Sequence, residues 1–171
     1  MKRLLIYIIT LAIATTVAIA QDYETDFREL QQQFEERLKT TPANLKAYMA
    51  SYPYTTYTDE IYFMEGVLYA EKGKYKQAIK AFSKVNAKNL SRESQPMLYF
   101  YWGYTLVKQN NYQQALSQLL RLKNQNSLYT PHARYYAGYC YYCMKEFPRA
   151  LAEFLAVEQL SGYQQIVPYY I

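Results

Sequence analysis

The residues with the most suggestive spacing for chemistry are two cysteines in the motif Cys140-Tyr141-Tyr142-Cys143. In thiol-disulfide oxidoreductases such a motif begins a helix that follows a strand, where the helix dipole lowers the thiol pKa. Here it falls in the second half of a predicted helix without a βαβ pattern, where two thiols three residues apart are poorly placed for a bridge. We expect packed or partly exposed free thiols; a structural or intermolecular disulfide is the open alternative, and a redox role is less favoured.

The other candidate groups have no partners for catalysis. His132 is the single histidine, so we interpret it as a surface residue, and Gly73-Lys74 lacks the preceding glycine of a phosphate-binding loop. Neither a nucleophile elbow nor a paired-carboxylate motif is visible. We therefore predict that the protein is not an enzyme and has no catalytic residues, cofactor or metal.

The first twenty residues have the pattern of a secretory signal peptide. Met1-Lys2-Arg3 is basic, residues 4–20 carry no charge, and Ala18-Ile19-Ala20 supplies the small residues that a signal peptidase reads. We predict cleavage after Ala20 and export to a periplasmic or outer-membrane-associated location. The alternative is an uncleaved membrane anchor, although the apolar run is at the lower limit for crossing a bilayer.

Composition narrows the class of protein further. The 171 residues are 51% hydrophobic, which excludes a disordered chain, and 22 of them are tyrosine. The net charge of +5 falls to +3 when Lys2 and Arg3 leave with the signal peptide. Because acidic and basic residues are interspersed, we expect no nucleic-acid partner, and membrane association only through partners or an uncleaved signal.

Residues 59–167 contain a pattern that recurs three times, with repeats 59–95, 96–130 and 131–167. Each repeat has a glycine, an alanine twelve residues later, and a large apolar residue four after that. These structural positions are Gly66, Ala78 and Phe82; Gly103, Ala115 and Leu119; and Gly138, Ala150 and Phe154. The small residues let two helices approach closely, and glycine or asparagine between the helices suits a left-handed helix end.

This pattern resembles the tetratricopeptide repeat family over residues 59 to about 167. The resemblance implies an all-α solenoid of antiparallel helix pairs in a right-handed superhelix, which acts as a scaffold for protein partners. Leu106 and Glu65 depart from the family's preferred Tyr and Leu. The ending Leu45…Tyr48…Tyr52-Pro53 resembles repeats of bacterial envelope proteins of the outer-membrane assembly lipoprotein type.

Two segments flank the repeats. Residues 21–58 are predicted to form a helical cap or degenerate half-repeat, because Phe27, Leu30, Phe34 and Leu38 have helical spacing over 26–39. Pro168 lies where a fourth repeat would begin, so residues 168–171 are interpreted as the start of a truncated repeat. The alternative is a short tail that covers the third repeat.

The candidate binding residues are an aromatic stripe at positions 5, 9 and 12 of each repeat, counted from its first residue. In the resembled family this stripe lines a concave groove. The aromatic members here are Phe63, Phe100, Tyr104, Tyr135, Tyr139 and Tyr142. We predict a scaffold in the cell envelope that binds protein segments on these rings. The alternative is that the rings pack against neighbouring repeats, in a structural or assembly subunit without a peptide groove.

Overall fold

The computed structural model describes residues 22–170, which contain helices and no strand. The predicted signal peptide, residues 1–20, lies outside the described residues. Contacts divide the chain into two compact units, up to Thr58 and from Asp59 onward. The described residues confirm the predicted all-α fold of helix pairs.

The first unit is a helical hairpin. Residues 22–35 form one helix and α2 (Thr41–Ser51) forms the other. Their buried side chains lie on one stripe of each helix: Phe27, Leu30 and Phe34 on the first, Leu45 and Tyr48 on the second. Amphipathic spacing thus accounts for this pair.

The first helix ends four residues earlier than the expected boundary at residue 39. Arg37 has a φ of 54°, so the chain leaves the helix in a left-handed turn. Leu38 is therefore 41% exposed instead of facing the core. The buried Thr41 hydroxyl holds the turn by donating to the carbonyls of Gln33 (3.1 Å) and Leu38 (2.8 Å).

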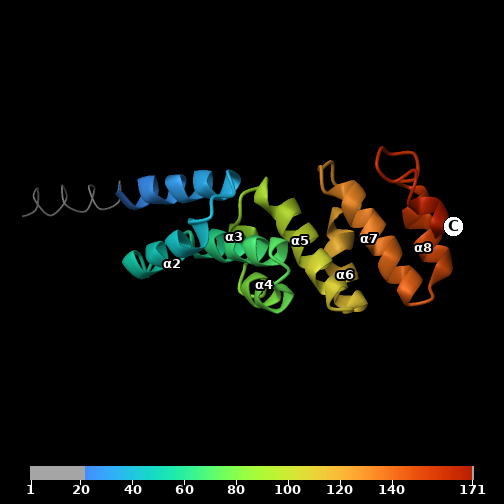
Figure 1. Ribbon diagram of the computed structural model, residues 1–171, viewed down its shortest axis with the longest axis horizontal. Helices are drawn as coiled ribbons and strands as arrows, with labels where there is room; N and C mark the ends of the chain where they lie inside the picture. Colours follow the sequence, from blue (N-terminus) through green and yellow to red (C-terminus); the bar gives the residue numbers. More distant parts are fainter. Residues whose placement is uncertain (1–21, 171) are drawn as a thin grey trace, which may run out of the picture. The chain divides into compact units, whose positions relative to one another are not determined.

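The second unit consists of three helix pairs. They are α3 (Thr58–Glu71) with α4 (Tyr75–Phe82), α5 (Ser94–Lys108) with α6 (Tyr112–Leu119), and α7 (Thr130–Cys143) with α8 (Phe147–Leu155). From α4 to α8 each helix packs against the next, as can be followed in Figure 1. Short 3₁₀ turns lie at Ala87–Asn89, Leu120–Leu122 and Val167–Tyr169.

Inside each pair, a glycine of the first helix lies directly against the bulky side chain of the second. A Cβ added at Gly103 would lie 2.5 Å from Leu119 Cγ, and one at Gly138 would lie 2.7 Å from Phe154 Cε1. A Cβ at Gly66 would overlap the Phe82 ring in the same way. The three recurring alanines Ala78, Ala115 and Ala150 are all buried. The repeat positions therefore set how closely the two helices of a pair approach.

The turn inside each pair has the same backbone geometry three times. Gly73, Asn110 and Lys145 adopt left-handed φ values of 69°, 57° and 63°. The residue after each donates its N–H to a carbonyl five residues back, at 2.8 to 2.9 Å, from Lys74, Asn111 and Glu146 to Tyr69, Leu106 and Tyr141. This bond satisfies a carbonyl that the helix end would leave unpaired.

The third repeat replaces an aromatic contact by an ion cluster. Arg134 stands at the position of Tyr62 and Tyr99 in the other repeats. Its guanidinium lies 3.0 Å from the Glu153 carboxylate, which is also 2.6 Å from Lys123 Nζ. Glu153 is 3% exposed, so these two cations compensate a buried charge.

The last helix leaves an apolar stripe exposed. Phe147, Leu151 and Leu155 follow one another at intervals of four residues on α8 and are 39–55% exposed. The residues equivalent to Leu151 in the earlier repeats, Ile79 and Leu116, pack into the core shared by α5, α6 and α7. Leu151 on α8 therefore occupies a position that is packed in the two earlier repeats.

The contact of Gly103 with Leu119 should appear as a coupling energy. Gly103→Ala gains about 1 kcal/mol of helix propensity but crowds the Leu119 side chain at a cost of about 1–3 kcal/mol, so we expect net destabilisation near 1 kcal/mol. Leu119→Ala alone should cost about 2–5 kcal/mol. In the double variant the missing side chain makes room for the new methyl group, so urea denaturation should show a loss at least about 1 kcal/mol smaller than the sum.

The matched control is Gln113→Ala on the exposed face of α6, which should combine additively with Leu119→Ala. Strict additivity of Gly103→Ala with Leu119→Ala would contradict the close-approach interpretation.

Candidate functional site

An aromatic hollow opens among four helices of the second unit. It is lined by Ala70 and Glu71 at the end of α3, Tyr75 at the start of α4, Phe100, Tyr101 and Tyr104 on α5, and Tyr136 on α7. Because the left-handed turn at Gly73 ends α3 and starts α4, it brings Glu71 and Tyr75 to the same rim. We call this site the aromatic hollow.

The rings of the hollow hold one another in place. Tyr104 is central: its ring centroid lies 5.2 Å from that of Tyr136, 6.1 Å from Phe100 and 6.3 Å from Tyr75. Phe100 and Tyr136 are also in contact, at 6.2 Å. Offset and edge-on arrangements of this kind are favourable and restrict side-chain motion, so the lining is rigid before any ligand arrives.

The polar groups of the hollow are neutral phenols and one carboxylate. Burial, with the hydrogen bond to Tyr75, raises the pKa of Tyr104 to about 12. Burial also raises the pKa of Tyr136. The Tyr101 hydroxyl donates to the Glu71 carboxylate at 3.0 Å, which fixes that charge at the rim. The floor is therefore uncharged at neutral pH.

The six residues of the predicted stripe do not lie together. Phe63 is buried, with 4% of its surface exposed. Phe100 and Tyr104 line the aromatic hollow. The three members on α7, Tyr135, Tyr139 and Tyr142, gather around the ring of Tyr170 from the C-terminal segment, at centroid distances of 6.4, 6.3 and 5.4 Å.

The C-terminal segment packs on the third repeat. Tyr170 stacks on Phe154 at 5.1 Å, and the buried Val167 and Tyr163 join the same core as Val157 and Ala150. Burial, with a smaller effect of the hydrogen bond to Tyr170, raises the pKa of Tyr135. The C-terminal segment therefore contacts the α7 part of the stripe, of which Tyr142 is still 41% exposed, and the α5 members Phe100 and Tyr104 line the aromatic hollow.

The aromatic stripe predicted from the sequence does not include three aromatic residues of the hollow. Tyr101 and Tyr136 occupy position 6 of their repeats, next to the stripe but not in it. Tyr75 is the first residue of α4 and lies outside the stripe, which runs along the first helix of each repeat. The recurrence of tyrosine at position 6 in two repeats is the signal that could have identified two of the three.

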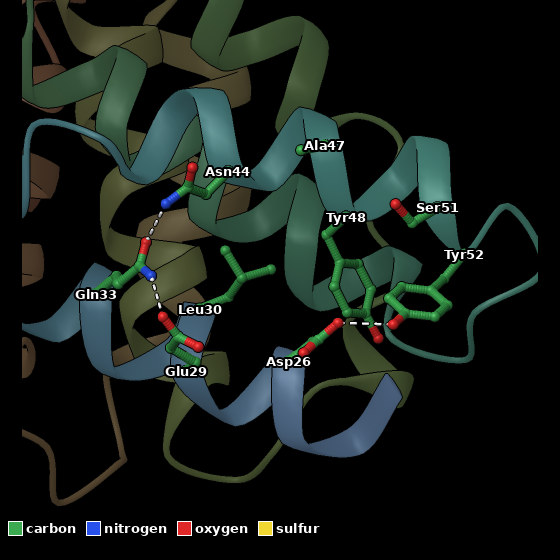
Figure 2. A pocket seen from close by; sticks show the side chains of 9 residues that line it. All are labelled: Asp26, Glu29, Leu30, Gln33, Asn44, Ala47, Tyr48, Ser51 and Tyr52. Carbon is green, nitrogen blue, oxygen red and sulfur yellow. Dashed lines mark hydrogen bonds between the residues drawn. The ribbon is translucent and has the colours of Figure 1, made fainter. Parts of the chain in front are cut away.

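The first unit has a separate, more polar pocket, shown in Figure 2. It lies between the helix of residues 22–35 and α2, above the buried side chains of Leu30 and Tyr48. Its carboxylates already accept hydrogen bonds from its own lining: Asp26 from Tyr52 at 2.6 Å and Glu29 from Gln33 at 3.1 Å. The bond to Asp26 raises the pKa of Tyr52 to about 12. Two aromatic rings line this pocket, those of Tyr48 and Tyr52 with centroids 4.7 Å apart, whereas five line the aromatic hollow.

The two cysteines are free in this structure. Cys140 faces the core between α6 and α7, where burial, with a smaller effect of Cys143, raises its pKa to about 12. Cys143 is partly exposed, and its hydrogen bond to Tyr139 raises the pKa of that phenol to about 12. A pKa this high leaves almost no Cys140 thiolate at neutral pH, which is the opposite of what a redox-active cysteine requires.

His132 is exposed, and its ring contacts two other aromatic side chains. Its Nδ1 lies 2.5 Å from the Tyr163 hydroxyl, and its ring lies 5.6 Å from Phe100. This histidine therefore joins the C-terminal segment to α7. Among residues 22–170, no group of three His, Cys, Asp or Glu side chains is placed to hold a metal ion, and no helix is long and apolar enough to cross a membrane.

A comparison with protein families matches residues 4–167 to the family described as Iml2/Tetratricopeptide repeat protein 39. A search of curated proteins and a search of solved structures each gave no match. This match includes residues 59–167, where the repeated pattern lies, and it confirms the tetratricopeptide resemblance.

The thiols should differ in reactivity because thiolate is the reacting form. In the folded protein at pH 8, we expect Ellman's reagent to titrate one thiol per chain, Cys143, and the second only after denaturation. Cys143→Ser should abolish the fast reaction, whereas Cys140→Ser should leave it intact. Rapid reaction of the Cys143→Ser variant before unfolding would show that Cys140 is accessible and ionised.

Proposed function

The chain belongs to the Iml2/Tetratricopeptide repeat protein 39 family, and we propose that it is a non-catalytic scaffold of the bacterial cell envelope that binds protein segments in the aromatic hollow. Tetratricopeptide repeats are in general protein-interaction modules, and protein partners are therefore the expected class. The observation that carries the proposal is the convergence of five aromatic rings from α4, α5 and α7 on one open site.

The physics of such a site supports binding of a protein segment. Tyrosine and phenylalanine present a large contact area with few rotatable bonds, and they dominate the energy of many protein interfaces. The mutual contacts around Tyr104 hold the rings in place before binding. Little entropy is then lost when a partner binds, because the lining does not have to be ordered.

The envelope location is supported by the N-terminal sequence. Lys2 and Arg3, the uncharged run of residues 4–20 and the small residues Ala18 and Ala20 have the order found in signal peptides. We propose export to the periplasm or to an outer-membrane-associated location, with cleavage after Ala20. An uncleaved signal would instead anchor the protein in the membrane across which it is exported.

A second candidate function is assembly by stacking on other subunits. It is favoured by the exposed stripe of Phe147, Leu151 and Leu155 on α8, since apolar patches on a soluble surface often mark interaction sites. In that case the protein would be a structural component of an envelope complex, without a peptide groove.

Partner capture tests the role of the hollow. Phe100→Ala combined with Tyr136→Ala removes two rings of the lining, and we expect at least about a tenfold loss of affinity for partners captured from envelope extract. The matched control is Tyr169→Ala, which removes a tyrosine that is 86% exposed and outside the hollow. Circular dichroism of each variant checks that the helices remain folded.

The two candidate functions predict different outcomes. If partners are still captured by the Phe100→Ala, Tyr136→Ala variant but not by a Leu151→Asp, Leu155→Asp variant, the partners bind the exposed stripe on α8. That result would favour the assembly function over binding in the hollow. Capture that is lost in Tyr169→Ala as well would show that the hollow has no special role.

Export is tested on the N-terminus of the expressed protein. We expect the envelope fraction to contain a chain that begins at Gln21, as measured by N-terminal mass spectrometry. Ala18→Arg combined with Ala20→Arg should block cleavage because the peptidase requires small residues there. A chain that retains Met1 and stays in the cytoplasmic fraction would contradict the proposed location.

A further inference from the structure

We propose that the segment bound in the aromatic hollow is acidic and inserts one aromatic or branched apolar side chain. This inference rests on the proposed function and specifies the chemistry of its ligand. It follows from two observations: the aromatic lining of the hollow, whose one carboxylate, Glu71, accepts a hydrogen bond from Tyr101, and a set of exposed lysines that flank two lining residues in the sequence.

The lining selects the anchor side chain. The hollow encloses about 340 Å³, which is enough for one large side chain and its neighbouring backbone. Its floor is built from the rings of Tyr75, Phe100, Tyr104 and Tyr136. Burial keeps the Tyr104 phenol neutral by raising its pKa to about 12. An apolar or aromatic anchor is favoured because it releases water from these rings without leaving a charge unpaired.

The rim selects the flanking residues. Lys72, Lys74 and Lys76 flank the lining residues Glu71 and Tyr75 in the sequence, and all three are exposed. We call them, together with the exposed Lys108, the lysine rim. Their combined positive potential favours carboxylates on either side of the anchor and increases the association rate of an acidic segment.

The hollow is poorly suited to a basic anchor. Lys108 Nζ already lies 5.3 Å from the centroid of the Tyr104 ring, so a cation of this chain occupies the ring face that an incoming cation would use. The carboxylate of Glu71 is engaged by the Tyr101 hydroxyl at 3.0 Å. An incoming lysine or arginine would have to displace Lys108 and would be repelled by the rest of the lysine rim.

Three matched synthetic peptides test the proposal on the mature chain, residues 21–171, by fluorescence anisotropy. The first peptide has a central phenylalanine between aspartate and glutamate residues, the second has alanine in place of the phenylalanine, and the third has lysines in place of the acids. We expect the first peptide to bind at least about tenfold more tightly than either of the others. Its affinity should also fall as the salt concentration rises.

Variants separate the anchor from the rim. Lys74→Glu combined with Lys76→Glu should weaken the acidic peptide about tenfold or more and leave the fold intact, since both positions are exposed and acidic residues suit the start of α4. The Tyr104→Ala variant should bind the phenylalanine peptide and the alanine peptide with similar affinity. Tyr169→Ala, at an exposed tyrosine outside the hollow, should bind all three peptides as the natural chain does.

Each contrary outcome has a distinct meaning. Equal binding of the acidic and basic peptides would overturn the charge preference, and equal binding of the phenylalanine and alanine peptides would overturn the anchor. If no peptide binds while Phe100→Ala combined with Tyr136→Ala still abolishes capture of the natural partner, the ligand chemistry is wrong but the proposed function stands. If capture is insensitive to those two substitutions, the proposed function itself fails.

Discussion

The three helix pairs depend on one contact, the packing of a bulky side chain against a bare glycine backbone. In each pair Phe82, Leu119 or Phe154 occupies the space that a glycine's missing Cβ leaves open. This contact sets the separation of the two helices, and the separation decides which side chains reach the next pair. The aromatic hollow is a consequence, because Tyr75 and Tyr104 meet only when α4 lies close to both α3 and α5.

The same architecture tolerates different chemistry at equivalent positions. Tyr62 and Tyr99 are replaced in the third repeat by Arg134, which is compensated by the buried Glu153. Removing either cation would leave the buried Glu153 carboxylate poorly compensated and would lower the stability of the third pair. Substitutions at Arg134 are therefore restricted to residues that keep a positive charge. In the other two pairs the equivalent tyrosines contact the exposed cations Lys84 and Arg121 over their ring faces, so these contacts bury no carboxylate.

Much of the fold could be predicted from local spacing, and less of the site. Glycine and bulky positions recur along one helix face, and helices α3, α5 and α7 begin within two residues of the expected repeat starts. Local spacing could not predict which rings of the aromatic stripe are exposed to solvent, because their exposure depends on residues far away in the sequence. Tyr170 covers Tyr139 from the C-terminal segment, and Tyr136 reaches the hollow from the following repeat.

The single tryptophan lies at the boundary between two repeats, so its fluorescence can be followed separately from that of the tyrosines. Trp102 on α5 is partly buried, and its ring lies 6.2 Å from that of Phe82 on α4. Repeat arrays are held by contacts between neighbours, so separate boundaries open with separate free energies. Tryptophan emission therefore reports the junction of the first and second repeats, whereas the tyrosines report the chain as a whole. A mismatch between the two signals during denaturation measures how independently the repeats unfold.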